Sequence, residues 1–157
     1  DGYPVPSRYR EFTDTGRRIS SSELSFRSGL PVIESLSTEG RGASTPPVDP
    51  EQAVGSSDPA SILGLLLSDR PADLACDIDT HVFDGWRLTH VTLSKEGPDA
   101  SRCSGHFRRV AGFDPEDIAE RTDFAFTVLL SPVDERTVRT DEVWFETTLG
   151  KGKLKRR

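Results

Sequence analysis

Three side chains capable of acid–base or metal chemistry flank one predicted hairpin. Asp79 and His81 precede the pair Asp84-Gly85, and His90 follows it. An Asp-Gly pair between apolar residues favours a two-residue β-turn, because glycine adopts a positive φ without steric cost. With that turn, Asp79 lies opposite His90, and His81 lies diagonally beside them. One carboxylate and two imidazoles in this arrangement could ligate a metal ion such as zinc or transfer protons.

A simpler interpretation of the same cluster is a partly exposed cross-strand charge pair. We favour it over a metal or hydrolase site on Asp79, His81 and His90, because a metal site also needs a supporting shell of hydrogen bonds. No serine stands in a Gly-x-Ser-x-Gly motif, so the sequence offers no marked nucleophile. We therefore expect no catalytic residue and no cofactor.

Five apolar side chains are candidates for a ligand cleft. Leu63, Leu66 and Leu67 fall on one face of a predicted helix. The two-residue turn pairs Phe83 with Trp86 on one side of the hairpin. If the helix packs in or against the concave side of a curved sheet, these leucines and aromatic rings would line a cleft for an apolar ligand.

The two cysteines present a geometric difficulty. The predicted turn places Cys76 opposite Leu93, and a simple meander places Cys103 opposite Leu93 on its other side. Two strands apart, the Cα atoms would be separated by about 9–10 Å. A disulfide requires about 7 Å or less. A bridge is therefore possible only if Cys76 lies off the strand, in the turn after the helix, or if the sheet bends sharply.

Short segments of alternating apolar and polar residues, separated by glycine and proline, predict a mostly β protein. We expect a strongly curved antiparallel sheet, an open barrel-like meander with one or two short helices. The predicted hairpin covers residues 77–93. The other predicted strands are residues 3–12, 17–26, 30–36, 101–110, 124–130, 138–147 and 149–155.

Two Asp-Pro pairs mark the predicted helix starts. Asp58-Pro59 opens the leucine helix, which Pro71 ends, and Asp114-Pro115 opens a helical turn. Residues 40–57 are rich in proline, glycine and serine, which disfavours helices and central strands. We expect this segment to be a mobile or loosely draped loop.

Composition restricts the function classes. A chain of 157 residues is expected to form a single domain, residues 1–157. Its net charge of −6 disfavours nonspecific binding of nucleic acid. No segment approaches the roughly 20 apolar residues that a transmembrane helix needs. The sequence has neither an initiator methionine nor a signal peptide, so we expect it to start within a longer protein.

Several short motifs follow one another along most of the chain. They are RYRE at 8–11, GRR at 16–18, SDP at 57–59, Cys76, VFDGWR at 82–87, Cys103, RRVAGF at 108–113, FAFT at 124–127, LGK at 149–151 and LKRR at 154–157. In this order they resemble the bacterial DUF3108 family of exported proteins, a domain of unknown function. Trp86 departs from the family pattern, which has another arginine after the Asp-Gly turn.

The resemblance implies an exported, periplasmic protein of which this chain is the C-terminal part. An oxidising compartment favours a disulfide between Cys76 and Cys103. The family supplies no catalytic residues. Our leading hypothesis is a non-enzymatic binding or carrier module for a lipid or another apolar component of the cell envelope. The alternative is a structural or interaction module that pairs with a partner through an exposed sheet edge.

Overall fold

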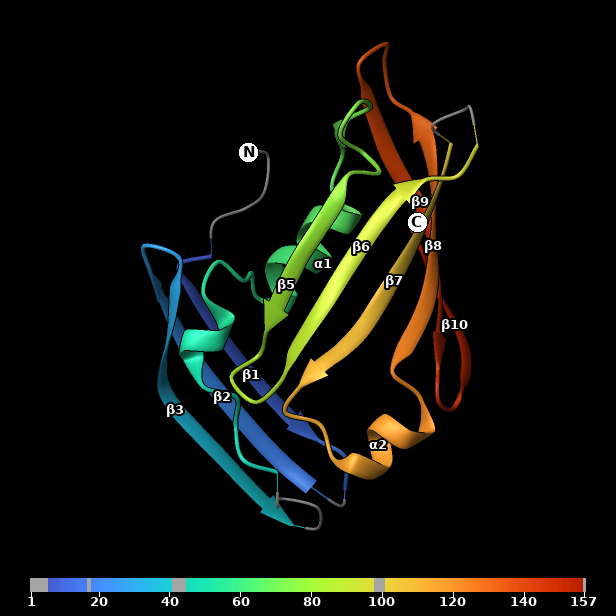
Figure 1. Ribbon diagram of the computed structural model, residues 1–157. Coiled ribbons are helices and arrows are strands. Elements are labelled where there is room, and N and C mark those ends of the chain that lie inside the picture. The colour runs from blue at the N-terminus through green and yellow to red at the C-terminus, as the bar shows by residue number, and fades with distance from the viewer. Residues whose placement is uncertain (1–5, 17, 41–44, 98–100, 157) are drawn as a thin grey trace.

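The computed structural model describes residues 6–16, 18–40, 45–97 and 101–156 and shows two antiparallel sheets (Figure 1). The first sheet has the order β1-β2-β3, and the second runs β10-β9-β8-β7-β6-β5, with the short β4 added on β9. The second sheet curls into a half-barrel, which confirms the predicted fold class. The elements are β1 (Arg8–Asp14), β2 (Arg18–Arg27), β3 (Leu30–Gly40), η1 (Pro50–Ala53), α1 (Pro59–Leu67), β4 (Arg70–Pro71), β5 (Ile78–Phe83), β6 (Leu88–Lys95), β7 (Arg102–Ala111), α2 (Pro115–Glu120), β8 (Asp123–Pro132), β9 (Thr137–Thr147) and β10 (Gly150–Lys155).

Although η1 and β4 were not predicted and some element ends differ, every predicted strand and helix forms. β8 shows why, because its alternating pattern buries Phe124, Phe126, Val128 and Leu130 on one face. In α1, Asp58 accepts hydrogen bonds from the backbone N–H groups of Ala60 and Ser61, as expected of a helix N-cap. The first predicted strand began at residue 3, whereas β1 begins at Arg8 and residues 1–5 lie outside the described residues.

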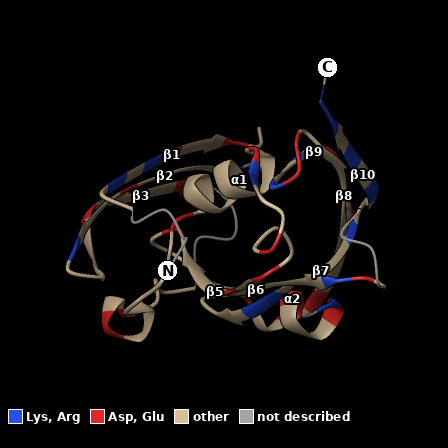
Figure 2. Ribbon diagram, turned by 90° about the horizontal axis from the view of Figure 1, so that it is seen from above, with Lys and Arg blue, Asp and Glu red and all other residues tan. Residues whose placement is uncertain are grey.

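The two sheets lie on opposite sides of the molecule. Seen from above, the second sheet curves from β5 and β6 through β7 to β8, β9 and β10 (Figure 2). The first sheet faces the β5–β6 end of this curve, and α1 lies between the first sheet and β9. There are accordingly two buried apolar clusters, one in the half-barrel against Ile62 of α1, and one between the first sheet and the tip of the β5–β6 hairpin.

The hairpin forms, but its turn is longer than predicted. Phe83 pairs with Leu88, so the turn has four residues, Asp84 to Arg87, instead of two. The physical reason is the Asp84 carboxylate, whose Oδ1 accepts the backbone N–H groups of Trp86 at 2.8 Å and Arg87 at 2.7 Å. Phe83 therefore does not pair with Trp86. The pairing of the two strands is thus shifted by two residues. Because side chains alternate between the faces of a strand with a period of two, each residue stays on its predicted face.

Gly85 is the point at which the two sheets meet. Its φ is +98°, and a Cβ atom there would lie 3.0 Å from Leu36 Cδ2 and 3.2 Å from Ser22 Cβ. The hairpin tip thus contacts β2 and β3 directly, with Phe83 and Leu24 fully buried beside it. A side chain at position 85 would be strained at this φ, and Leu36 and Ser22 would have to shift by a few tenths of an ångström to admit its Cβ atom.

The segment predicted as a mobile or loosely draped loop contains several buried residues, although just over half of its described residues are exposed. Residues 41–44 lie outside the described residues, but Val48 and Ala53 are buried in the second apolar cluster. The Ser57 N–H donates to the His81 carbonyl at 2.8 Å, and the Phe83 N–H donates to the Ser57 carbonyl at 2.9 Å. The prolines limit regular structure here to the short η1, but they do not prevent the burial of individual side chains such as Val48.

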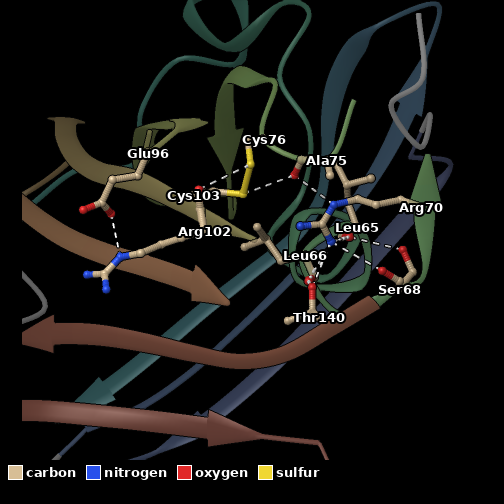
Figure 3. The surroundings of a disulfide bond; sticks show 10 residues. All are labelled: Leu65, Leu66, Ser68, Arg70, Ala75, Cys76, Glu96, Arg102, Cys103 and Thr140. Carbon is tan, nitrogen blue, oxygen red and sulfur yellow. Dashed lines mark hydrogen bonds and ion pairs between the residues drawn. A yellow bond between two sulfur atoms is a disulfide. The ribbon is translucent and has the colours of Figure 1, made fainter. Parts of the chain in front are cut away.

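Cys76 and Cys103 form a disulfide with a Cα–Cα distance of 5.4 Å (Figure 3). Cys76 lies in the turn before β5, which resolves the geometric difficulty in the first of the two ways foreseen from sequence. Neither cysteine lies opposite Leu93 as predicted, because the β5–β6 and β6–β7 pairings are each displaced by two residues from the predicted register. Ile78 lies opposite Leu93, and Cys103 lies opposite Lys95.

A buried arginine joins the disulfide turn to α1 and β9. The Arg70 guanidinium donates to the carbonyl oxygens of Ala75 at 3.0 Å, Leu65 at 3.0 Å and Leu66 at 2.9 Å, and to Thr140 Oγ1 at 3.1 Å (Figure 3). Burial lowers the pKa of Arg70 from its ordinary value. A cation beside the last carbonyls of a helix is also favoured by the helix dipole.

Reducing the disulfide should lower the free energy of unfolding by about 3–4 kcal/mol, since the bridge closes a long loop of the unfolded chain. Urea unfolding with and without reductant measures this, and a Cys76→Ala/Cys103→Ala double variant should match the reduced protein. Two thiols reacting with Ellman's reagent before reduction would contradict the bridge.

Replacing Arg70 with methionine should lower the free energy of unfolding by about 3 kcal/mol or more, because several buried carbonyls lose their donor. Arg139→Met is the matched control. Arg139 pairs with Asp69 at the surface, and such pairs contribute about 1 kcal/mol or less. Equal effects of the two substitutions in urea unfolding would contradict the role of Arg70.

Candidate ligand-binding groove

A groove of about 680 Å³ lies between α1, the concave face of the half-barrel and β1. Its walls are mainly apolar. From α1 come Ile62, Leu63 and Leu66. Strands β5 to β9 contribute inward-facing side chains, which include Val82, Val91, Phe107, Phe124, Phe126, Val143 and Phe145.

Two of the five predicted cleft residues line the groove, and the other three do not. Leu63 and Leu66 line the groove. Leu67, the last residue of α1, does not line it and is 40% exposed. Phe83 is fully buried in the second cluster, under the first sheet. Trp86 lines a smaller cavity that adjoins the groove, because the four-residue turn removes it from the strand.

Sequence reasoning missed the arginine and the aromatic rings at the α2 end of the groove. The Arg109 guanidinium lies 5.2 Å from the Phe113 ring centre and 5.1 Å from that of Phe124. It also donates to the carbonyl oxygens of Arg121, at 2.8 Å, and Asp117. These contacts fix the side chain in place by cation–π attraction and hydrogen bonds. The signal available in the sequence was the alternation of side chains along β7, which places Arg109 on the inward face.

The end of the groove nearest the first sheet is polar. Tyr9 donates its hydroxyl to Glu11 Oε2 at 2.5 Å, and Thr13 Oγ1 donates to Glu11 Oε1 at 2.9 Å. Asp84 and Arg87 of the hairpin tip face the same space. Burial, followed by the hydrogen bond to Glu11, raises the pKa of Tyr9, so its hydroxyl is a donor at neutral pH.

Burial also raises the pKa of Asp84, against the opposing effect of the backbone N–H groups of Trp86 and Arg87. The nearby Glu11 carboxylate raises it further, whereas the Arg87 guanidinium lowers it. Two acids and one arginine thus meet at this end of the groove.

The cluster Asp79, His81 and His90 forms, but on the other face of the sheet. The rings of His81 and His90 stack with their centres 4.8 Å apart, and His90 Nε2 lies 2.6 Å from Asp79 Oδ1. His81 lies directly opposite His90, and Asp79 lies opposite Thr92, which corrects the predicted pairing. Within the described ranges, no group of three or more His, Cys, Asp or Glu side chains is placed to hold a metal ion.

The basic residues near the C-terminus are matched by acids of the neighbouring strand. Lys151 lies 3.8 Å from Glu146, and Lys153 and Lys155 lie 3.9 and 3.1 Å from Glu142. These charges follow β10 along the outside of the half-barrel (Figure 2). They are cross-strand pairs at an edge, and of these residues Glu146 also lines the groove.

No protein-family model matches the chain, and no curated protein or solved structure is significantly similar to it. The groove is therefore interpreted from its own geometry. In the part of the chain that the structure describes, no helix has the length and apolar character needed to cross a membrane.

Asp84→Asn should make the protein less sensitive to rising pH. The amide oxygen can still accept from Trp86 and Arg87, but no charge has to be buried. Because the folded-state pKa of Asp84 is raised above 3.8, its contribution to stability is present at low pH and is lost as the pH rises through that raised value.

Urea unfolding of both proteins between acidic and neutral pH measures the difference. The gap in unfolding free energy between the Asp84→Asn variant and the unmodified protein should widen in favour of the variant as the pH rises. A gap that is constant with pH, or that widens in the opposite direction, would contradict a raised pKa at Asp84.

Proposed function

We propose that this protein is a non-enzymatic binding or carrier module for an amphiphile with a single apolar chain. The observation that supports this function is the groove between α1 and the half-barrel, whose volume of about 680 Å³ lies within the range of about 300–1,000 Å³ common for small-molecule sites. Its walls are aliphatic and aromatic, and polar groups are concentrated at the ends. That distribution suits a ligand with an apolar body and a polar end.

We place the protein in the bacterial periplasm, as the resemblance to the DUF3108 family implies. The disulfide between Cys76 and Cys103 supports an oxidising compartment, because such bridges are rare in the cytosol. An apolar component of the cell envelope is then the natural ligand class. We thus propose both the family membership and the periplasmic location.

The alternative function, pairing with a partner strand, is favoured by the ends of the sheets. β1 and β3 end the described first sheet, and β10 ends the second. The β10 edge carries Lys151, Lys153 and Lys155, and lysine-rich edges resist strand addition. The outer side of β5 is partly covered by Ser57, which bridges to Val82. We therefore prefer the binding module.

Leu63→Glu should weaken binding of the uncharged dye phenylnaphthylamine by about tenfold or more, because it replaces apolar groove surface with a charge. Leu67→Glu is the matched control, since Leu67 belongs to the same helix and is similarly exposed but does not line the groove. Dye fluorescence during titration measures both affinities.

Equal weakening in the two variants would place the dye elsewhere. If the unmodified protein binds neither the dye nor any decyl-chain amphiphile, and native mass spectrometry finds no co-purified lipid, the proposed function is wrong.

A further inference from the structure

A second cavity, of about 190 Å³, adjoins the groove between the first sheet and the hairpin tip. We call it the polar chamber. It shares Glu11, Asp84 and Arg87 with the groove, so these three residues stand where the two cavities meet. The remaining walls are hydroxyl-bearing or charged side chains and one indole: Thr13, Thr15, Arg18, Ser20, Ser21, Ser22 and Trp86.

Two polar atoms at the chamber are buried without a protein partner. Ser22 is 2% exposed, and its Oγ has no hydrogen-bond partner among the described residues. The same holds for Trp86 Nε1, an obligate donor. Leaving a buried polar group without a partner is energetically costly, so two such groups in residues that line one cavity indicate a ligand or water that supplies the missing hydrogen bonds.

The alternation of the first sheet explains how these groups come together. Ser22 of β2 lies opposite Glu11 of β1, and Ser20 lies opposite Thr13, so all four side chains share the inward face. The apolar Tyr9 and Leu24 occupy the neighbouring pair of that face. The inward face thus changes from apolar to polar at the hairpin tip.

The charges of the described residues that line the chamber are balanced. Glu11 and Asp84 supply two carboxyl groups, and Arg18 and Arg87 supply two guanidinium groups. An anionic group would meet the carboxylates, and a cationic group would meet the arginines. An uncharged polyhydroxyl group can donate to the carboxylates and accept from the indole N–H at the same time.

We propose that the polar chamber binds the uncharged, hydroxyl-rich head group of an amphiphile whose apolar chain occupies the groove. The chamber volume of about 190 Å³ suits a small head group, which we take to be a single sugar or glycerol unit. This inference rests on the proposed function, since it assigns the polar end of the same ligand.

The test compares four ligands with the same decyl chain, each kept below its micelle concentration. They are decyl glucoside, decanoate, decyltrimethylammonium and decylphosphocholine. Displacement of phenylnaphthylamine gives each affinity. We expect decyl glucoside to bind about tenfold more tightly than the charged and zwitterionic ligands, because only its head group matches both donors and acceptors.

Two substitutions remove the unpaired groups. Ser22→Ala and Trp86→Phe should each weaken decyl glucoside binding several-fold and leave decanoate binding unchanged. Trp144→Phe is the control, because it removes the other tryptophan of the chain, whose Nε1 already donates to Glu142 at 2.9 Å. Since Ser22 Oγ has no protein partner among the described residues, Ser22→Ala should lose no stability in urea unfolding.

The Trp144→Phe protein also provides a direct spectroscopic readout, because Trp86 is then its only tryptophan. Decyl glucoside should shift the emission of Trp86, and decanoate should not. Equal affinities for all four ligands, tightest binding of a charged or zwitterionic one, or glucoside binding unaffected by both substitutions would overturn this inference while the proposed function stands. Failure of every decyl ligand to displace the dye would overturn both.

Discussion

The hydrogen bonds of Arg70 hold together the three parts that create the groove. Its guanidinium reaches the last turn of α1, the turn that carries Cys76, and Thr140 of β9. Thr140 in turn donates to the Leu66 carbonyl at 2.6 Å, so the helix end is bound to the half-barrel twice. Without these bonds, a helix this short would have only its apolar contacts to fix it over the concave face, because isolated short helices are marginal in water. The groove exists because α1 stands at a fixed distance from β5 to β9.

The second constraint is the contact between the hairpin tip and the first sheet. Gly85 allows the turn to approach Ser22 and Leu24 closely, and Asp84 fixes the turn by accepting two backbone N–H groups. This contact buries Phe83 and closes the second apolar cluster. It also brings the polar half of the first sheet against Trp86 and Arg87. One turn therefore joins the two sheets and separates the apolar groove from the polar chamber.

Much of the fold was predictable because the deciding interactions are local. Alternation in β8 and the Asp-Pro caps of α1 depend on residues that are neighbours in sequence. The candidate site was only partly predictable. Leu63 and Leu66 were found from helical spacing. Phe83 was misplaced, because the first sheet covers its face of the hairpin. Trp86 was misplaced, because the turn length depends on how the Asp84 side chain hydrogen-bonds. Tyr9 and Glu11 were missed, because no local pattern relates β1 to a hairpin more than sixty residues later.

The sequence by itself determined the mostly β class, the strands and helices, and which residues of each strand share a face, since these follow from side-chain period and backbone preference. Even the wrong hairpin register preserved those faces, because a shift of two residues matches the period of a strand. Only the tertiary structure decided the disulfide geometry, the burial of Val48 and Ala53, and the contact between the groove and the polar chamber. Those features depend on contacts between segments far apart in the chain. Such contacts contribute to stability only when both segments are packed together.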